Sequence, residues 1–317
     1  MKKSFSPSLE AGNGTMEGII ILAVLIIIMI STYGNPPPDR ATGPSDNTLY
    51  LSGNTSATGE NIGTPTSSYA RNISLSTGNA PYAYQPFEEY ITIDNRGQDP
   101  VDITGWRLEN GKDKRGYDLG SGLRYFAADA ATIGQAAPFI SPLGLNYFQN
   151  IVLKDGETAI ITTGSIGSRS PYNIVSFKEN ICSGYLEDRP EYTFTPPLTR
   201  NCPRPANEPG VAALDTECRR FIERMASCRV PEFDTRDTEG EICRNCVDGQ
   251  PLSGSCVAFI KSRFNYGSCI ANHSSDANFS GRTWRVFLGR GWEMWAKEYE
   301  TIELFDRLGR LVDEESY

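Results

Sequence analysis

Residues 87–110, FEEYITIDNRGQDPVDITGWRLEN, determine the fold class that we expect for this chain. Within residues 89–95 the apolar side chains of Ile91 and Ile93 alternate with polar ones, which is the period of a strand with one buried face. The turn residues 96–100 follow and lead into a second extended segment. The stretch therefore predicts two β-strands joined by a short turn.

The second segment, residues 101–109 (VDITGWRLE), changes phase in its middle. Val101 and Ile103 share one face, whereas Trp106 is one step out of phase with them. A β-bulge at Gly105 would restore the alternation, because glycine suits the backbone of a bulge. We expect Trp106 to fill the core between two sheets.

Further short β-type runs, separated by turn residues, lie at residues 72–77, 151–153, 158–163, 173–177, 284–288, 300–305 and 310–312. Residues 151–163 and 300–312 are each expected to form a hairpin around a tight turn. Seven or more short strands of this kind predict a mainly β chain in which two sheets pack as a Greek-key β-sandwich.

Three segments resemble the lamin tail domain family. Residues 87–110 match its opening strands, with the Gly105–Trp106 pair as the most specific part, residues 152–164 (VLKDGETAIITTG) match its middle hairpin, and residues 300–317 match its closing hairpin. The resemblance covers residues 72–178 and 282–317. It implies an immunoglobulin-like sandwich in which Gly105 and Trp106 are structural, and it carries over no catalytic residue.

Two departures from the family matter. Residues 211–277 have no counterpart in a plain lamin tail, and no sustained heptads indicate the coiled-coil rod of lamins. The chain is therefore similar to bacterial surface proteins in which this domain follows an export signal or a membrane anchor.

The N-terminal region predicts a membrane anchor. Residues 18–30 carry no polar side chain, and residues 18–34 reach the short end of what spans a bilayer. Lys2 and Lys3 favour a cytoplasmic location for residues 1–17. A cleaved signal peptide and a buried core helix are the alternatives, although Glu17 abuts the run where a signal peptide prefers cations.

Residues 35–70 are rich in proline, glycine, serine and threonine. Such a segment cannot bury enough apolar surface to offset its ordering entropy, so we expect a linker that holds the folded domain, residues 71–317, away from the membrane. An ordered extended arm on that domain is the alternative.

All eight cysteines fall within residues 181–280, which we expect to be a separately stabilised insertion in one loop of the sandwich: Cys182, Cys202, Cys218, Cys228, Cys243, Cys246, Cys256 and Cys269. An even number of cysteines in a domain outside the membrane favours disulfides, here four of them. Eight cysteines can be paired in 105 ways, so the pairing stays open. The alternatives are a structural zinc site of Cys243, Cys246, Cys256 and Cys269, and a redox site at the C-x-x-C pair.

Two helices are expected in the insertion, at residues 216–229 and 255–264. Asp215 is the candidate N-cap of the first, and Ser253 or Ser255 that of the second. Each helix places one cysteine on its apolar stripe, which suits a small core that disulfides cross-link between helices.

The composition excludes several function classes. The chain has 317 residues, 30 Lys and Arg against 39 Asp and Glu, and a net charge of −9, which argues against a nucleic-acid-binding face. His273 is the single histidine, so motifs that need two are absent. His273 with Asp276 is a catalytic candidate, although a loop histidine beside serines is more often solvated or structural. Residues 306–309 are a hairpin turn and, as the alternative, a calcium candidate.

Aromatic residues crowd the last part of the chain: Trp284, Trp292, Trp295, Tyr299 and Phe305. Packing in the core is one interpretation, and an exposed platform for a sugar or a partner is the other. The adjacent acidic residues 88–89 and 313–315 indicate solvated edges rather than an acid/base pair.

The sequence thus predicts a single-pass membrane protein with an extracytoplasmic domain that has a structural or binding role and no catalysis. Its expected partners are the lipid bilayer and an envelope or surface protein or polysaccharide, with no nucleic acid and no cofactor. The alternatives are an envelope hydrolase with a carboxylate site near the insertion and a structural-zinc interaction module.

Overall fold

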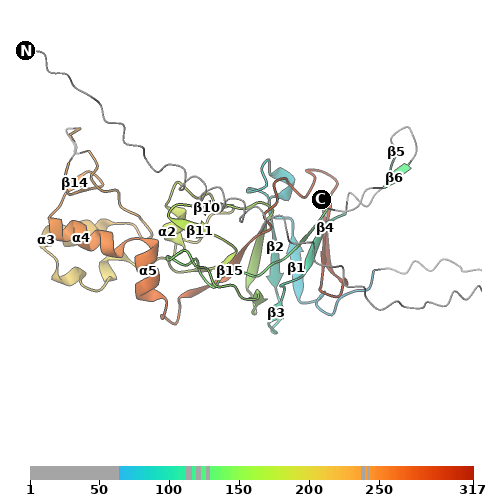
Figure 1. Cartoon of the computed structure of the whole chain (residues 1–317). Helices are drawn as coiled ribbons and strands as arrows, with labels where there is room; N and C mark the ends of the chain where they lie inside the picture. Colours follow the sequence, from blue (N-terminus) through green and yellow to red (C-terminus); the bar gives the residue numbers. More distant parts are fainter. Residues whose placement is uncertain (1–63, 112–115, 119–122, 126–128, 237–239, 242) are drawn as a thin grey trace, which may run out of the picture. The chain divides into compact units, whose positions relative to one another are not determined.

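The computed structural model describes residues 64–111, 116–118, 123–125, 129–236, 240–241 and 243–317 (Figure 1). These residues belong to one compact unit, residues 61–317. The expected cytoplasmic segment and membrane span, residues 1–17 and 18–34, lie outside the described residues, as does most of the expected linker. Within the described part, the helices are too short or too polar to cross a membrane.

The largest sheet has five strands in the order β1-β2-β9-β15-β12. Their bounds are β1 Ile73–Ser76, β2 Tyr90–Asn95, β9 Thr158–Thr162, β15 Ser280–Phe287 and β12 Phe177–Asn180. β9 and β15 pair in parallel, and the other neighbours pair antiparallel. A strand from after the insertion therefore completes a sheet that begins near the start of the domain.

The second sheet has four strands in the order β17-β16-β4-β7, with bounds Leu311–Ser316, Thr301–Phe305, Arg107–Asn110 and Ala130–Thr132. All its pairs are antiparallel. β16 and β17 form the hairpin expected at the end of the chain. Four two-stranded sheets accompany it, formed by β3 Val101–Asp102 with β8 Val152–Leu153, β5 Gly116–Asp118 with β6 Leu123–Tyr125, β10 Gly167–Arg169 with β11 Tyr172–Ile174, and β13 Cys246–Val247 with β14 Gln250–Pro251.

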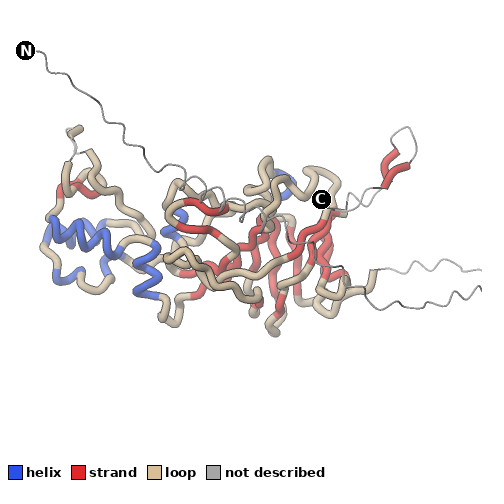
Figure 2. Tube along the Cα trace, in the orientation of Figure 1, coloured by secondary structure: helices blue, strands red, loops and turns tan. Residues whose placement is uncertain are grey.

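Both large sheets contribute to one hydrophobic core. Alternate side chains of their strands are buried in it, as Ile91, Ile161, Trp284 and Leu304 illustrate. The side chains that alternate along the strands therefore pack the two sheets against each other. The described part of the chain is mainly β with a few helices (Figure 2).

The predicted continuous strand 101–109 is wrong, because the chain turns in its middle. Gly105 has a φ of +80°, a conformation that favours glycine, and the Asp102 carboxylate accepts a hydrogen bond from the Thr104 backbone N–H at 2.9 Å. This turn separates β3 from β4 and sends β4 into the other sheet. Trp106, 1% exposed, then lies in the shared core as expected.

The expected hairpin of residues 151–163 is also wrong. β8 pairs with β3, whereas β9 lies between β2 and β15 in the five-stranded sheet. The tight turn is present, since the Glu157 N–H donates to the Lys154 carbonyl at 2.9 Å, but it joins two sheets instead of two neighbouring strands.

The insertion leaves the five-stranded sheet after Asn180 and returns at Ser280, and these two residues are Cα partners in the β12–β15 ladder. It holds the α-helices of the described residues, as Figure 2 shows, together with two 3-10 turns. The bounds are α2 Gly184–Glu187, η3 Pro205–Asn207, η4 Val211–Ala213, α3 Thr216–Arg224, α4 Gly254–Arg263 and α5 Tyr266–His273.

Local sequence positions the two expected helices. The Asp215 side chain accepts from the Cys218 N–H, as expected, and of the two candidates for the second helix it is Ser253, not Ser255, whose side chain accepts from the Cys256 N–H. α3 ends at Arg224, earlier than expected, because Met225 is extended. α5 was not expected from the sequence, and the Asn265 side chain caps it.

The hydrophobic core of the insertion extends into the β domain. Its core contains the disulfide-bonded cysteines together with Phe177 of β12, Ile174 of β11, and Ala137 and Ile140, which precede β8. The apolar residues of the insertion therefore pack on segments of the β domain, and the two parts share a core.

The last residues of the expected linker are part of the folded unit. The Leu311 N–H donates to the Pro65 carbonyl at 2.9 Å, and the Ser67 N–H donates to the Leu311 carbonyl at 2.7 Å. Ser67 also donates through its hydroxyl to Asp306 at 2.7 Å. These contacts favour the ordered-arm interpretation for residues 65–67.

Candidate functional site

The eight cysteines form four disulfides: Cys182–Cys269, Cys202–Cys228, Cys218–Cys256 and Cys243–Cys246. The bond between Cys218 and Cys256 joins α3 to α4, a pairing that the sequence had left open. The alternative zinc set of Cys243, Cys246, Cys256 and Cys269 is not brought together, because its members belong to three different disulfides. The C-x-x-C pair is itself one of the four bonds.

His273 lies between two carboxylates. Its Nδ1 is 2.8 Å from Asp276 and its Nε2 is 2.9 Å from Glu208, which comes from the segment after η3. Desolvation alone would lower the pKa of His273, but the hydrogen bonds and charges of Asp276 and Glu208 outweigh it and raise the pKa. Both ring nitrogens are therefore paired, and His273 links α5 to Glu208.

The seam between the insertion and the five-stranded sheet contains a buried ion pair. The Arg285 Nε of β15 donates to Glu179 of β12 at 2.5 Å, and both side chains are about 5% exposed or less. The Arg285 Nη atoms donate to the carbonyls of Pro196 and Pro197 at 2.6 and 2.8 Å. This single guanidinium therefore fastens the segment before residue 200 to the sheet.

A cavity of about 330 Å³ opens at the same seam, lined among others by Glu179, Asn201, Asn278 and Thr283. Among its described lining residues the one carboxylate is Glu179, which Arg285 already neutralises.

The turn at residues 306–309, considered for calcium, is held by its own residues. Asp306 accepts hydrogen bonds from Ser67, Leu308 and Arg310. Desolvation opposes the ionised form, but these donors together lower the pKa of Asp306. The carboxylate is thus used to close the turn of the β16–β17 hairpin.

The C-terminal aromatic residues divide into two groups. Trp284, Trp295 and Phe305 are buried and serve the core. Trp292 and Tyr299, in the loop between β15 and β16, are 56% and 76% exposed. Core packing therefore holds for the first group, whereas the second group is exposed, as a platform would have to be.

Two more exposed aromatic side chains come from another part of the chain. Tyr82 ends the 3-10 turn η1, Ala80–Tyr82, and Tyr84 follows it; they are 77% and 71% exposed. The residues after η1 meet the β15–β16 loop, because Lys297 of that loop lies over the Tyr84 ring. We call Tyr82, Tyr84, Trp292 and Tyr299 the aromatic surface.

Glu89 joins the two segments. Its buried carboxylate accepts the backbone N–H groups of Met294 and Trp295 at 2.7 and 3.2 Å. Burial raises the pKa of Glu89, although these hydrogen bonds and one from Thr163 oppose the shift. The residue that looked like a solvated edge is therefore an internal anchor, which only the tertiary contact reveals.

Cations orient two rings of the aromatic surface. Lys297 Nζ lies 3.1 Å from the centre of the Tyr84 ring, and the Arg290 guanidinium lies 5.3 Å from that of Trp292. Asp129 accepts from both the Trp292 indole N–H at 2.9 Å and Arg290 at 2.6 Å. The rings are exposed and yet held in place, with hydrogen-bonding groups beside them.

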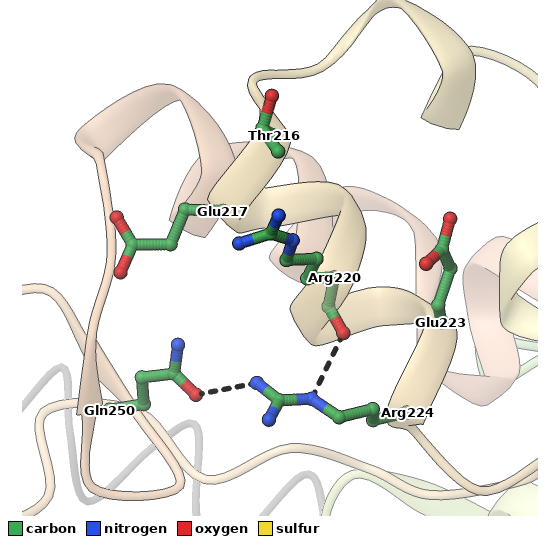
Figure 3. A pocket seen from close by; sticks show the side chains of 6 residues that line it. All are labelled: Thr216, Glu217, Arg220, Glu223, Arg224 and Gln250. Carbon is green, nitrogen blue, oxygen red and sulfur yellow. Dashed lines mark hydrogen bonds between the residues drawn. The ribbon is translucent and has the colours of Figure 1, made fainter.

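A cavity of about 630 Å³ lies along α3 (Figure 3). Arg224 donates to the Arg220 carbonyl at 3.1 Å and to Gln250 at 3.3 Å. Glu217 and Glu223 of the same helix line the cavity as well. Two cations and two carboxylates leave no net charge to select an ion, so this cavity is a weaker candidate than the aromatic surface.

The sequence identified Trp292 and Tyr299 but not Tyr82 and Tyr84. The signal available was the aromatic, proline-containing run at residues 81–87, PYAYQPF, just before the fold-determining stretch. Searches of protein-family models and of curated proteins find no match to this chain.

Proposed function

We propose that this chain is a membrane-tethered, extracytoplasmic binding protein whose β domain is an immunoglobulin-like sandwich of the lamin tail type. Residues 18–34 anchor it and the following residues act as the tether, with residues 1–17 in the cytoplasm. The four disulfides support an oxidising location, because such bonds persist mainly outside the cytosol.

The observation that carries the binding role is the aromatic surface. Large exposed rings on loops that a buried carboxylate fixes cost little entropy when a ligand immobilises them. Aromatic anchors with polar neighbours are typical of recognition surfaces. The proposed ligand is an envelope polysaccharide or a surface protein, in line with the expectation from the sequence.

Binding is measured with the full chain in lipid nanodiscs, first against soluble fragments of peptidoglycan and capsular polysaccharide and then against a surface-protein fraction. The variants Tyr84→Ala and Trp292→Ala are each expected to weaken binding at least tenfold, because they remove a large part of the contact area. Leu308→Ala is the matched control, since Leu308 is 75% exposed but lies in the β16–β17 turn. If Tyr84→Ala and Trp292→Ala bind as tightly as Leu308→Ala and the wild type, the proposal is contradicted.

A further inference from the structure

The loop of residues 141–150, SPLGLNYFQN, leads into β8 and exposes large apolar side chains in succession. Leu143, Leu145 and Tyr147 are 89%, 85% and 76% exposed, and Phe148 is 45% exposed. An isolated exposed apolar residue is ordinary, but four in one loop mark a surface that meets another apolar phase. We call residues 141–150 the apolar loop.

The loop is built to hold these side chains outward. The Asn146 side chain accepts the Ser141 N–H at 2.8 Å and donates to the Asn173 carbonyl at 3.1 Å. Ala136 and Gln149 close the base of the loop with two backbone hydrogen bonds of 3.0 and 2.9 Å. Polar groups of the chain fix the loop from within, so its apolar tips do not fold back onto the domain.

The sequence around the loop carries no charge. Residues 130–153 contain no Asp, Glu, Lys or Arg, in a chain where these residues make up 22% of the sequence. Placing a charge in the hydrocarbon region of a bilayer is expensive, so a segment that enters lipid must lack charges or keep them at the interface. Tyr147 belongs to the residue types enriched at that interface.

The chain outside the described residues supplies the second argument. Residues 35–63 separate the proposed anchor from the first described residue, and a chain of that length reaches at most about 100 Å. In the proposed topology this limited reach keeps the domain beside its own membrane and raises the effective concentration of the loop at the lipid surface. A loop with weak intrinsic affinity for lipid would then be in contact with it for much of the time.

We infer that the apolar loop inserts Leu143, Leu145 and Phe148 into the outer face of the bilayer that anchors the chain. The inference rests on the proposed function, because it needs residues 18–34 in that bilayer. The loop would add a second contact between the chain and the membrane. Two contacts would fix the orientation of the domain, and with it the face that is directed away from the bilayer and toward the ligand.

The test uses the full chain reconstituted into phosphatidylcholine vesicles that contain lipids spin-labelled near the head of the acyl chain. A polarity-sensitive dye is attached to Tyr147→Cys in one sample and to Leu308→Cys, the matched exposed position, in another. We expect blue-shifted emission and quenching by the spin label at position 147 and neither at position 308. Adding Leu143→Ser and Leu145→Ser lowers the ratio of inserted to free loop at least tenfold, since about 1.4 kcal/mol of lost transfer free energy is a factor of ten.

The outcomes separate the two proposals. A chain that does not float with the vesicles after an alkaline wash overturns the anchor and the loop inference together. A chain that floats while the dye at position 147 reports water overturns the loop inference alone. Emission at position 147 that shifts only as the protein density in the vesicles rises identifies a second copy as the occupant and also overturns it.

Discussion

Loss of the buried Arg285–Glu179 pair is expected to loosen the join between the insertion and the five-stranded sheet. In Arg285→Met the Glu179 carboxylate stays about 95% buried without its cation, and the carbonyls of Pro196 and Pro197 lose their donors. Removing one partner of a buried ion pair costs about 3–5 kcal/mol. For a unit of this size about 4 kcal/mol corresponds to a fall in Tm of about 8–16 °C.

The measurement is the free energy of unfolding in urea, with Tm from calorimetry, on the oxidised full chain in nanodiscs. The double variant Arg285→Met/Glu179→Leu removes both charges, and replacing a buried pair by apolar residues is often neutral. We therefore expect it to recover most of the lost stability. Arg282→Met on the same strand is the control, because Arg282 is exposed and its guanidinium donates to the Asp155 carbonyl at the surface.

Two results would refute this reasoning. One is a loss below about 1 kcal/mol in Arg285→Met, which would mean that water or a rearranged side chain replaces the guanidinium at no great cost. The other is a double variant as unstable as the single one, which would mean that the packing of the arginine stem, and not the charge left on Glu179, determines the loss.

Three further perturbations test other parts of the fold. Because Asp276 and Glu208 raise the pKa of His273, its stabilisation is present below the unfolded pKa of about 6.5 and is lost as the pH rises through the higher folded value; the Tm difference between the wild type and His273→Gln should shrink from pH 6 to pH 9, and a constant difference contradicts it. Trp106→Ala should cost about 3–5 kcal/mol in urea unfolding, because the side chain is buried in the shared core; a loss below about 1 kcal/mol would show that the ring does not seal the sheets. Replacing both cysteines by serine at the Cys182–Cys269 disulfide, with a sequence separation of 87, should cost about 4–5 kcal/mol, against about 2 kcal/mol at Cys243–Cys246, with a separation of 3; calorimetry that ranks the two losses in the opposite order would contradict the chain-entropy argument.

The candidate site was only partly accessible from the sequence. Trp292 and Tyr299 stood out by composition, but nothing local says that Trp295 turns into the core while Trp292 stays outside. That division follows from Glu89, which captures the backbone of the loop from a distance of 205 residues along the chain. Because Glu89 follows another glutamate, the sequence predicts a solvated carboxylate, and only the contact with the Met294 and Trp295 N–H groups shows that it is buried.

The sequence by itself determined the features that depend on neighbours along the chain. Alternation placed Ile91 and Ile93 on one buried face, Asp215 was recognisable as an N-cap and Ser253 as one of two candidates, and the even number of clustered cysteines favoured disulfides. These features depend on interactions between residues that are close in the sequence, namely side-chain periodicity and capping hydrogen bonds. A short stretch of sequence is therefore enough to predict them.

The tertiary structure alone decided which segments meet. It paired β9 in parallel with β15 across the whole insertion, selected one of 105 disulfide pairings, and used the left-handed turn at Gly105 to send β4 to the second sheet. Strands of similar pattern have similar affinities for one another, so the choice among partners depends on how all of them fill one core at once. That is a property of the packed domain, which no stretch of the chain carries on its own.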